Sequence, residues 1–214
     1  MGNLFRPDGK AFAVLDRITD YAVLSLLWLV CCVPLVTIGA ATSALYTITL
    51  RWQQQQDVSL FRDFFRAFRC NFKPGLVLSV LLLVAVLVLG TDGYLLAVGA
   101  VPGGRPVLFL LCALAMLVLM AASYVFALLA FFDDPVRALV RNAVLMSLRY
   151  FPRTVLLLLT SFGPLAAALA CYQTTHLLLY LCVVFAPAVC ARANAFILYP
   201  VFQKHLPDVL EEPG

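Results

Sequence analysis

Few side chains in this sequence could carry out chemistry, and their spacing argues against a catalytic or metal site. The chain has seven cysteines and two histidines. It contains no Cys-x-x-Cys pair and no cysteine–histidine spacing typical of zinc. Six of the cysteines lie in apolar stretches, where cysteine behaves as a small hydrophobic residue. We therefore expect no catalytic residue, no metal and no cofactor, and we predict that the protein is not an enzyme.

The most distinctive polar positions follow a proline inside a long apolar run. Small and hydroxyl-bearing residues stand there in close succession: Pro34, Thr37, Gly39, Thr42 and Ser43. Proline lacks an amide hydrogen and clashes with the preceding helical turn, so we expect a helix break over residues 34–39. A broken helix can offer backbone groups to a polar ligand, whereas small residues let two helices pack closely. Packing is the favoured interpretation.

Charged residues inside apolar segments are further functional candidates, because burying a charge in a membrane is costly. Asp92 stands near the expected outer end of one apolar segment, and Arg192, with Asn194, stands in the last one. The alternative for Asp92 is that water solvates it. The alternative for Arg192 is that its long side chain extends to the inner membrane surface.

The composition shows what kind of elements must position these residues. Hydrophobic residues make up 64% of the 214 residues and charged residues 12%, against about 45–50% and about 25% in soluble domains. This balance excludes a soluble enzyme, a disordered chain and a nucleic-acid-binding module. It predicts an all-α membrane protein in contact with the lipid bilayer.

Long charge-free runs predict the membrane spans, because about 20 apolar helical residues cross a bilayer. Runs without Asp, Glu, Lys or Arg cover residues 21–50, 74–91, 106–132 and 154–191. We expect one integral membrane domain, 1–214, with spans near 12–33, 39–55, 75–98, 107–132, 154–171 and 177–199. Whether residues 21–50 cross once or twice stays open, which gives five or six transmembrane helices.

Positive charge sets the expected orientation, because Lys and Arg gather on the cytoplasmic side. Five cations fall in residues 51–73 and four in residues 133–153. Two crossings of residues 21–50 would place 14 of the 15 cations inside. We therefore favour six spans in a bacterial cell membrane, with the C-terminus and the N-terminus both cytoplasmic.

Two segments between the spans, 59–73 and 135–151, predict basic amphipathic helices. In the first, phenylalanines recur at helical spacing on one face and cations on the other. Such helices lie in the membrane interface, where their cations contact anionic lipid headgroups; alternatively, the phenylalanine face packs on the protein's own spans. Each segment leads to a proline, Pro74 or Pro152, and then to two spans, so the chain resembles a repeated unit. The lipid-facing cations are Arg62, Arg66, Arg69, Lys73, Arg137, Arg141 and Arg149.

Three blocks of the sequence resemble the YesL-type family of small bacterial membrane proteins. These blocks are residues 27–40 (LWLVCCVPLVTIGA) with Ala44-Leu45-Tyr46, residues 61–68 (FRDFFRAF) with Asn71-Phe72, and residues 133–153 followed by Thr154. The resemblance covers most of the chain. One departure is Phe131-Phe132, where the family pattern has Arg-Phe, so no role of that arginine is carried over.

The resemblance implies a function without a known reaction. The family has no established biochemical activity, and its members often lie beside ABC-type saccharide importers and sensor kinases in Gram-positive bacteria. It implies a non-enzymatic accessory or assembly subunit for carbohydrate uptake or sensing, with an ABC-type saccharide permease as the expected partner. The alternative is a small transporter or channel for a polar solute that uses the broken helix and Asp92. A membrane enzyme acting on lipid or glycan is the least supported reading.

Overall fold

Helices account for every regular element in the part of the chain that the structure describes. The computed structural model describes residues 10–54, 56–98, 104–132, 134–170 and 176–205. The elements are α1 (Lys10–Cys32), the 3₁₀ turn η1 (Leu35–Thr37), α2 (Ile38–Gln53), α3 (Leu60–Cys70), α4 (Phe72–Ala97), α5 (Gly104–Phe131), α6 (Val136–Arg149), α7 (Phe151–Ala170) and α8 (His176–His205). The predicted all-α class is confirmed.

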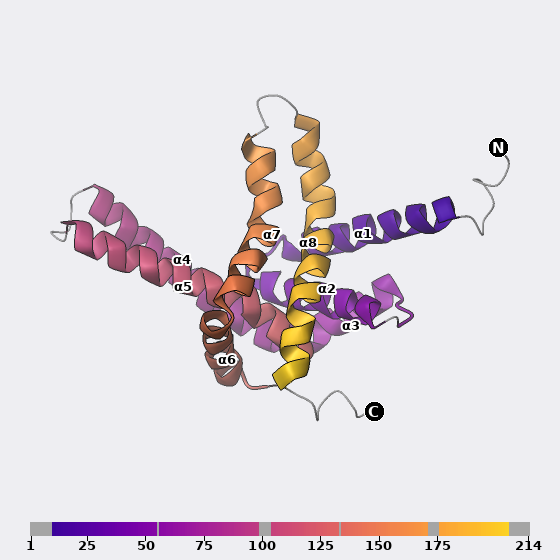
Figure 1. Cartoon of the computed structure of the whole chain (residues 1–214), viewed down its shortest axis with the longest axis horizontal. Helices are drawn as coiled ribbons and strands as arrows, with labels where there is room; N and C mark the ends of the chain where they lie inside the picture. The colour runs from indigo at the N-terminus through magenta and orange to yellow at the C-terminus, as the bar shows by residue number, and fades with distance from the viewer. Residues whose placement is uncertain (1–9, 55, 99–103, 133, 171–175, 206–214) are drawn as a thin grey trace.

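Helix α2 lies at the centre of the arrangement, and the longer helices extend away from it in different directions (Figure 1). It contacts α1, α3, α4, α5 and α8. The reason lies in its sequence, since small residues such as Ala40, Ala41 and Ala44 let neighbouring helices come close on several sides. Ten residues of α2 are buried: Gly39, Ala40, Ala41, Ser43, Ala44, Leu45, Tyr46, Ile48, Thr49 and Leu50.

The hairpin of α4 and α5 and the hairpin of α7 and α8 form two separate arms (Figure 1). Segments Phe72–Leu96 and Pro106–Phe131 are each long and apolar enough to cross a membrane, and a third candidate arises if α6 and the first part of α7 count as one bent span. This count of two or three concerns the described residues alone. The apolar helices indicate a membrane-embedded protein. The turn expected between 154–171 and 177–199 falls on residues 171–175, outside the described residues.

The first charge-free run contains the predicted break. Helix α1 ends at Cys32 and α2 begins at Ile38. The two helices then run back alongside each other, as contacts at both ends show. The indole nitrogen of Trp28 donates a hydrogen bond to the Thr42 hydroxyl over 3.2 Å. Further along, the Tyr21 and Trp52 rings meet edge to face with centroids 5.4 Å apart.

Prolines set the helix boundaries of the two arms more tightly than the sequence pattern suggested. The pattern predicted a helix through Lys73, but α3 ends at Cys70 and Pro74 lies in the first turn of α4. Continuing the helix would bring the Pro74 ring against the carbonyl of residue 70, whereas the first turn of a helix needs no amide hydrogen. Pro152 acts in the same way at the start of α7, where the chain bends by 104°.

Candidate functional site

A cavity of about 780 Å³ lies where the two arms meet the central helices. Residues of α1, α2, α4, α5, α7 and α8 line it: Trp28, Leu29, Thr42, Leu45, Tyr46, Leu82, Val86, Leu89, Gly90, Ala115, Val118, Leu119, Ala122, Ser123, Phe126, Ser161, Phe162, Ala186, Pro187, Cys190, Ala191 and Asn194. None of these described lining residues is Asp, Glu, Lys or Arg. The walls are therefore apolar, with a few uncharged polar groups.

The polar groups of the cavity gather around Asn194 of α8. Its side-chain nitrogen donates to the Tyr46 hydroxyl over 3.2 Å and to the Ser161 hydroxyl over 2.8 Å. Its side-chain oxygen accepts a hydrogen bond from the Thr160 hydroxyl. These bonds use both amide hydrogens and tie α8 to α2 and α7. We call these four side chains the Asn194 cluster.

A second set of contacts satisfies the helix break. The Thr37 hydroxyl lies 2.6 Å from the carbonyl oxygen of Cys31 and 2.7 Å from that of Pro34, and can donate to either. The amide of Gly39 donates to the Ser79 hydroxyl over 2.7 Å, and Ser79 donates in turn to the Gly75 carbonyl over 2.9 Å. The polar groups at the break are thus engaged within the protein.

Close approach of α2 and α4 explains why glycine stands at both contact points. A Cβ atom at Gly39 would overlap the carbonyl oxygen of Gly75 and lie 2.5 Å from the Ser79 hydroxyl. A Cβ atom at Gly75 would lie 2.7 Å from the amide nitrogen of Ala40. These distances are too short for real Cβ contacts, so the geometry supports the packing interpretation of the break.

The predicted functional residues divide between several places. Thr42 and Asn194 line the cavity. Ser43 is buried and donates within its own helix to the Ala40 carbonyl, and Pro34 is exposed. Asp92 is exposed on α4 and is not among the residues that line the cavity.

Arg192 lies apart from the main cavity. It lines a second, smaller cavity with Tyr21 of α1 and Gln53 of α2. The structure therefore brings Asn194 and Thr42 to one cavity and sends Arg192 to another, although Arg192 and Asn194 are two residues apart in the sequence.

The cations that the sequence singled out lie on α3 and α6, except Lys73, which lies in the first turn of α4. Arg62, Arg66, Arg69, Lys73, Arg137, Arg141 and Arg149 are all exposed. The phenylalanine face of α3 divides: Phe64 is buried against the core, whereas Phe61 is 61% exposed and Phe65 43% exposed. Part of this face therefore packs on the protein, as one of the two interpretations expected, and part of it is exposed.

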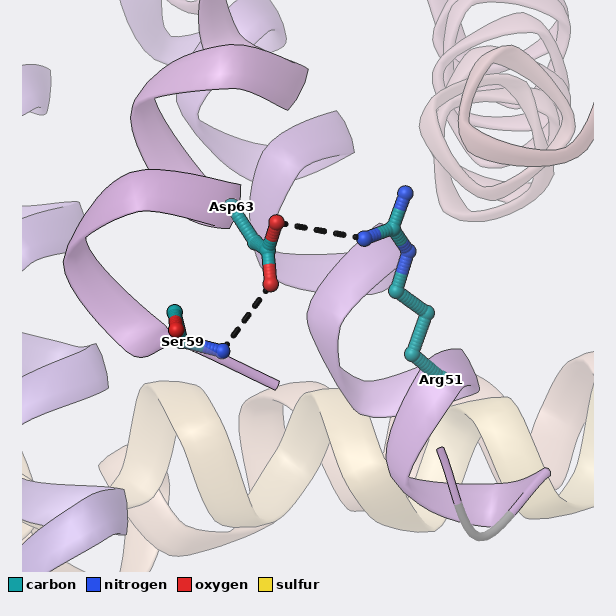
Figure 2. A network of polar contacts seen from close by, with 3 residues as sticks. All are labelled: Arg51, Ser59 and Asp63. Carbon is teal, nitrogen blue, oxygen red and sulfur yellow. Dashed lines mark hydrogen bonds and ion pairs between the residues drawn. The ribbon is translucent and has the colours of Figure 1, made fainter. Parts of the chain in front are cut away.

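Figure 2 shows how α3 is attached to the end of α2. The Asp63 carboxylate accepts a hydrogen bond from the backbone amide of Ser59 over 2.9 Å. The same carboxylate forms an ion pair with the Arg51 guanidinium over 3.4 Å. Asp63 thus caps the start of α3 and fixes the connection between the two helices.

Sequence reasoning missed the partners of Asn194 and Gly39. Tyr46, Thr160, Ser161 and Ser79 are single hydroxyls within apolar runs, and such hydroxyls often bond only to their own helix. The available signal was the presence of Asn194 in the same apolar segment as Arg192, which requires hydrogen-bond partners somewhere in the fold. Among the described residues, no group of three or more His, Cys, Asp or Glu side chains lies together as a metal ligand set would.

The family comparison concerns the N-terminal part of the chain. A model of a family described as "Protein of unknown function, DUF624" matches residues 21–93. These residues include the second half of α1, all of α2 and α3 and most of α4, and therefore contain both the Gly39–Gly75 contact and the Asp63 ion pair. We found no match among curated proteins or among solved structures.

Proposed function

We propose that this chain is a non-enzymatic accessory or assembly subunit of a bacterial ABC-type saccharide importer, embedded in the cell membrane. In this proposal, the cavity between the arms receives an apolar transmembrane segment of the permease. The observation that carries it is the lining: apolar walls from six helices with uncharged polar groups. Such a surface suits an apolar helix with a single polar contact, because small and polar residues together promote helix association in membranes.

The YesL-type resemblance of the sequence supports the choice of partner. Members of that family often lie beside saccharide importers and sensor kinases. A role in saccharide uptake and a role in saccharide sensing therefore fit the resemblance equally well. The family match to residues 21–93 carries no function of its own. The partner and the process are therefore our proposal.

We further propose six membrane crossings with both termini in the cytoplasm. The contacts from Trp28 to Thr42 and from Tyr21 to Trp52 support this topology, because they bring α2 back alongside α1. Helices α3 and α6 then lie at the cytoplasmic interface, where their exposed arginines would face anionic headgroups. Labelling a cysteine introduced at Asn3 from outside intact cells tests this arrangement, and efficient labelling would contradict it.

Crosslinking in native membranes tests the partner site directly. A photoreactive residue at Val118, which lines the cavity, should capture permease subunits. The matched control is Phe109, which is 75% exposed on the same helix and is not a lining residue. Equal capture from both positions would show that the cavity is not the docking site.

A cavity-filling variant completes the test. Ala122→Trp would occupy the cavity, whereas Ala113→Trp adds the same bulk at an exposed position of α5 that is not among the lining residues. We expect only Ala122→Trp to abolish copurification of the permease from mild detergent. Recovery of the wild-type protein alone, with unchanged sugar uptake after deletion of its gene, would refute the proposal.

A transporter for a polar solute is the second candidate, and the Asn194 cluster beside the cavity favours it. Purified protein in liposomes should then carry a polar solute, and Asn194→Leu should abolish the flux. The absence of flux, or flux that Asn194→Leu leaves unchanged, would count against this alternative.

A further inference from the structure

The second cavity combines a cation with apolar walls. It has a volume of about 520 Å³ and lies where α1, α2 and α8 meet. Its lining residues are Tyr21, Gln53, Val189, Arg192, Ala193, Phe196 and Ile197. Val189 and Phe196, on either side of Arg192 along α8, are 49% and 72% exposed. A ligand of this cavity would meet both a positive charge and an exposed apolar surface.

The guanidinium of Arg192 is incompletely satisfied within the protein. Its Nη1 atom is buried and has no hydrogen-bond partner in the described part of the chain. A buried donor that lacks a partner is costly, and more so when it is charged. The rest of the Arg192 side chain is partly exposed and lines the cavity, so an anion bound there would balance its charge.

Neighbouring residues place the cavity at the level of the lipid headgroups. Gln53 is the last residue of α2, and exposed polar residues such as Gln54, Gln56 and Asp57 follow it. Tyr21, which lines the cavity, contacts Trp52 edge to face, and such aromatic side chains concentrate at membrane interfaces. Arg192 is thus near the polar surface rather than at the centre of the bilayer.

We propose that this cavity binds the phosphate of an anionic phospholipid. The planar guanidinium of Arg192 matches phosphate oxygens with paired hydrogen bonds. The amide of Gln53 can add another donor. An acyl chain of the same molecule would cover Val189 and Phe196. The site differs from the exposed arginines of α3 and α6, since it uses a partly buried cation and a cavity.

Fluorescence quenching by brominated lipids tests the site in the full-length protein. The chain has two tryptophans, so Trp28→Phe leaves Trp52, beside the cavity, as the only one. This protein is placed in bilayers that contain phosphatidylglycerol or phosphatidylcholine with brominated acyl chains. The buffer contains 1 M salt, which reduces the Debye length to about 3 Å and screens the exposed arginines.

Both lipids carry a phosphate, but phosphatidylcholine also brings a choline cation, which the positive charge of Arg192 repels. We therefore expect brominated phosphatidylglycerol to bind about tenfold more strongly than phosphatidylcholine. Arg192→Gln should remove this preference, and Arg192→Lys should keep part of it, because lysine retains the charge without the paired geometry. Arg137→Gln, an exposed cation on α6, is the matched control and should have no effect.

Three results would overturn the proposal. The first is equal quenching by the two lipids in the Trp28→Phe protein that retains Arg192, a result that does not depend on the folding of an Arg192 variant. The second is an equal loss of preference in Arg137→Gln and Arg192→Gln, which would indicate general surface charge. The third is loss of the preference on adding inorganic phosphate or glycerol phosphate, which would assign the site to a soluble anion.

Discussion

The unit α3–α4–α5 and the unit α6–α7–α8 follow the same order of elements but are attached to the core by different means. The first is held by backbone proximity: Gly39 and Gly75 bring α2 and α4 together, and the Ser79 hydroxyl accepts the Gly39 amide hydrogen. The second is held by side-chain hydrogen bonds. Asn194 joins α8 to α2 and α7.

A further bond at the base of the second unit follows the same principle. The hydroxyls of Tyr124 in α5 and Thr154 in α7 lie 3.1 Å apart, and Thr154 donates to the Ser147 carbonyl over 2.9 Å. Backbone contact permits only one spacing between two helices, whereas side chains of several atoms hold helices further apart. The cavity lies between the two units, and helices of both units line it together with α1 and α2.

The comparison predicts its largest effect at Gly39. Gly39→Ala should lower the free energy of unfolding by about 3 kcal/mol, because the new methyl group overlaps Gly75 and Ser79. Thermal unfolding of the purified protein in mild detergent measures this. Gly93→Ala is the matched control: nothing lies within 4 Å of a Cβ at Gly93, and alanine favours a helix by about 0.5–1 kcal/mol. If both variants behave alike, backbone proximity does not hold the first unit.

Replacing Asn194, which holds the second unit to α2, should cause the next largest loss of stability. Asn194→Leu leaves the hydroxyls of Tyr46, Thr160 and Ser161 without this partner, and we expect a loss of about 2 kcal/mol. Ser123→Ala is the control, because the Ser123 hydroxyl lines the same cavity but bonds to the Leu119 carbonyl of its own helix. Unfolding temperatures that fall equally for the two variants would contradict the role given to Asn194.

A smaller effect is expected from Ser79→Ala. This change removes the acceptor of the buried Gly39 amide and should cost about 1–2 kcal/mol. Hydrogen exchange should show faster exchange of the Gly39 amide, a readout specific to this contact. Thr91→Ala serves for comparison, because the exposed Thr91 hydroxyl bonds only within α4. An unchanged exchange rate at Gly39 in Ser79→Ala would rule out this hydrogen bond.

The smallest effect concerns the ion pair in Figure 2. Arg51 and Asp63 are partly exposed, at 37% and 17%, and exposed ion pairs contribute about 0.2–1 kcal/mol. A double-mutant cycle with Arg51→Gln and Asp63→Asn should give a coupling of about 0.5 kcal/mol that disappears at high salt. A coupling above 2 kcal/mol would show that the first unit depends on this pair as much as on its glycines.

The sequence predicted those parts of the fold that depend on residues close to one another along the chain. Charge-free runs located the apolar helices, and Pro34 located the break, because a proline acts on the backbone of its own helix. The ends of α3 and α6 were less accurate, since they depend on where the clash with Pro74 or Pro152 falls.

The candidate site was predicted only in part, because its residues come from distant segments. Asn194 and Tyr46 are 148 residues apart, and nothing in the neighbourhood of either residue specifies the other. Gly39 stood out within a stretch of small residues, but its contact with Gly75 depends on how α2 and α4 cross. Thr42 and Asn194 were therefore selected individually, and the cavity between them was not foreseen.

The position of Asn194 near the end of the chain has a consequence for biosynthesis. Tyr46 is made long before Asn194, and at about 5–20 residues per second the ribosome needs about 7–30 s to cover the 148 residues between them. The Ser25 hydroxyl likewise accepts a hydrogen bond from the backbone amide of Ala188 in α8, which is made much later than Ser25. The Gly39–Gly75 contact, by contrast, involves residues made close together in time. The newly made chain can thus assemble its first unit early, while its central helices keep an open side until the last helix arrives.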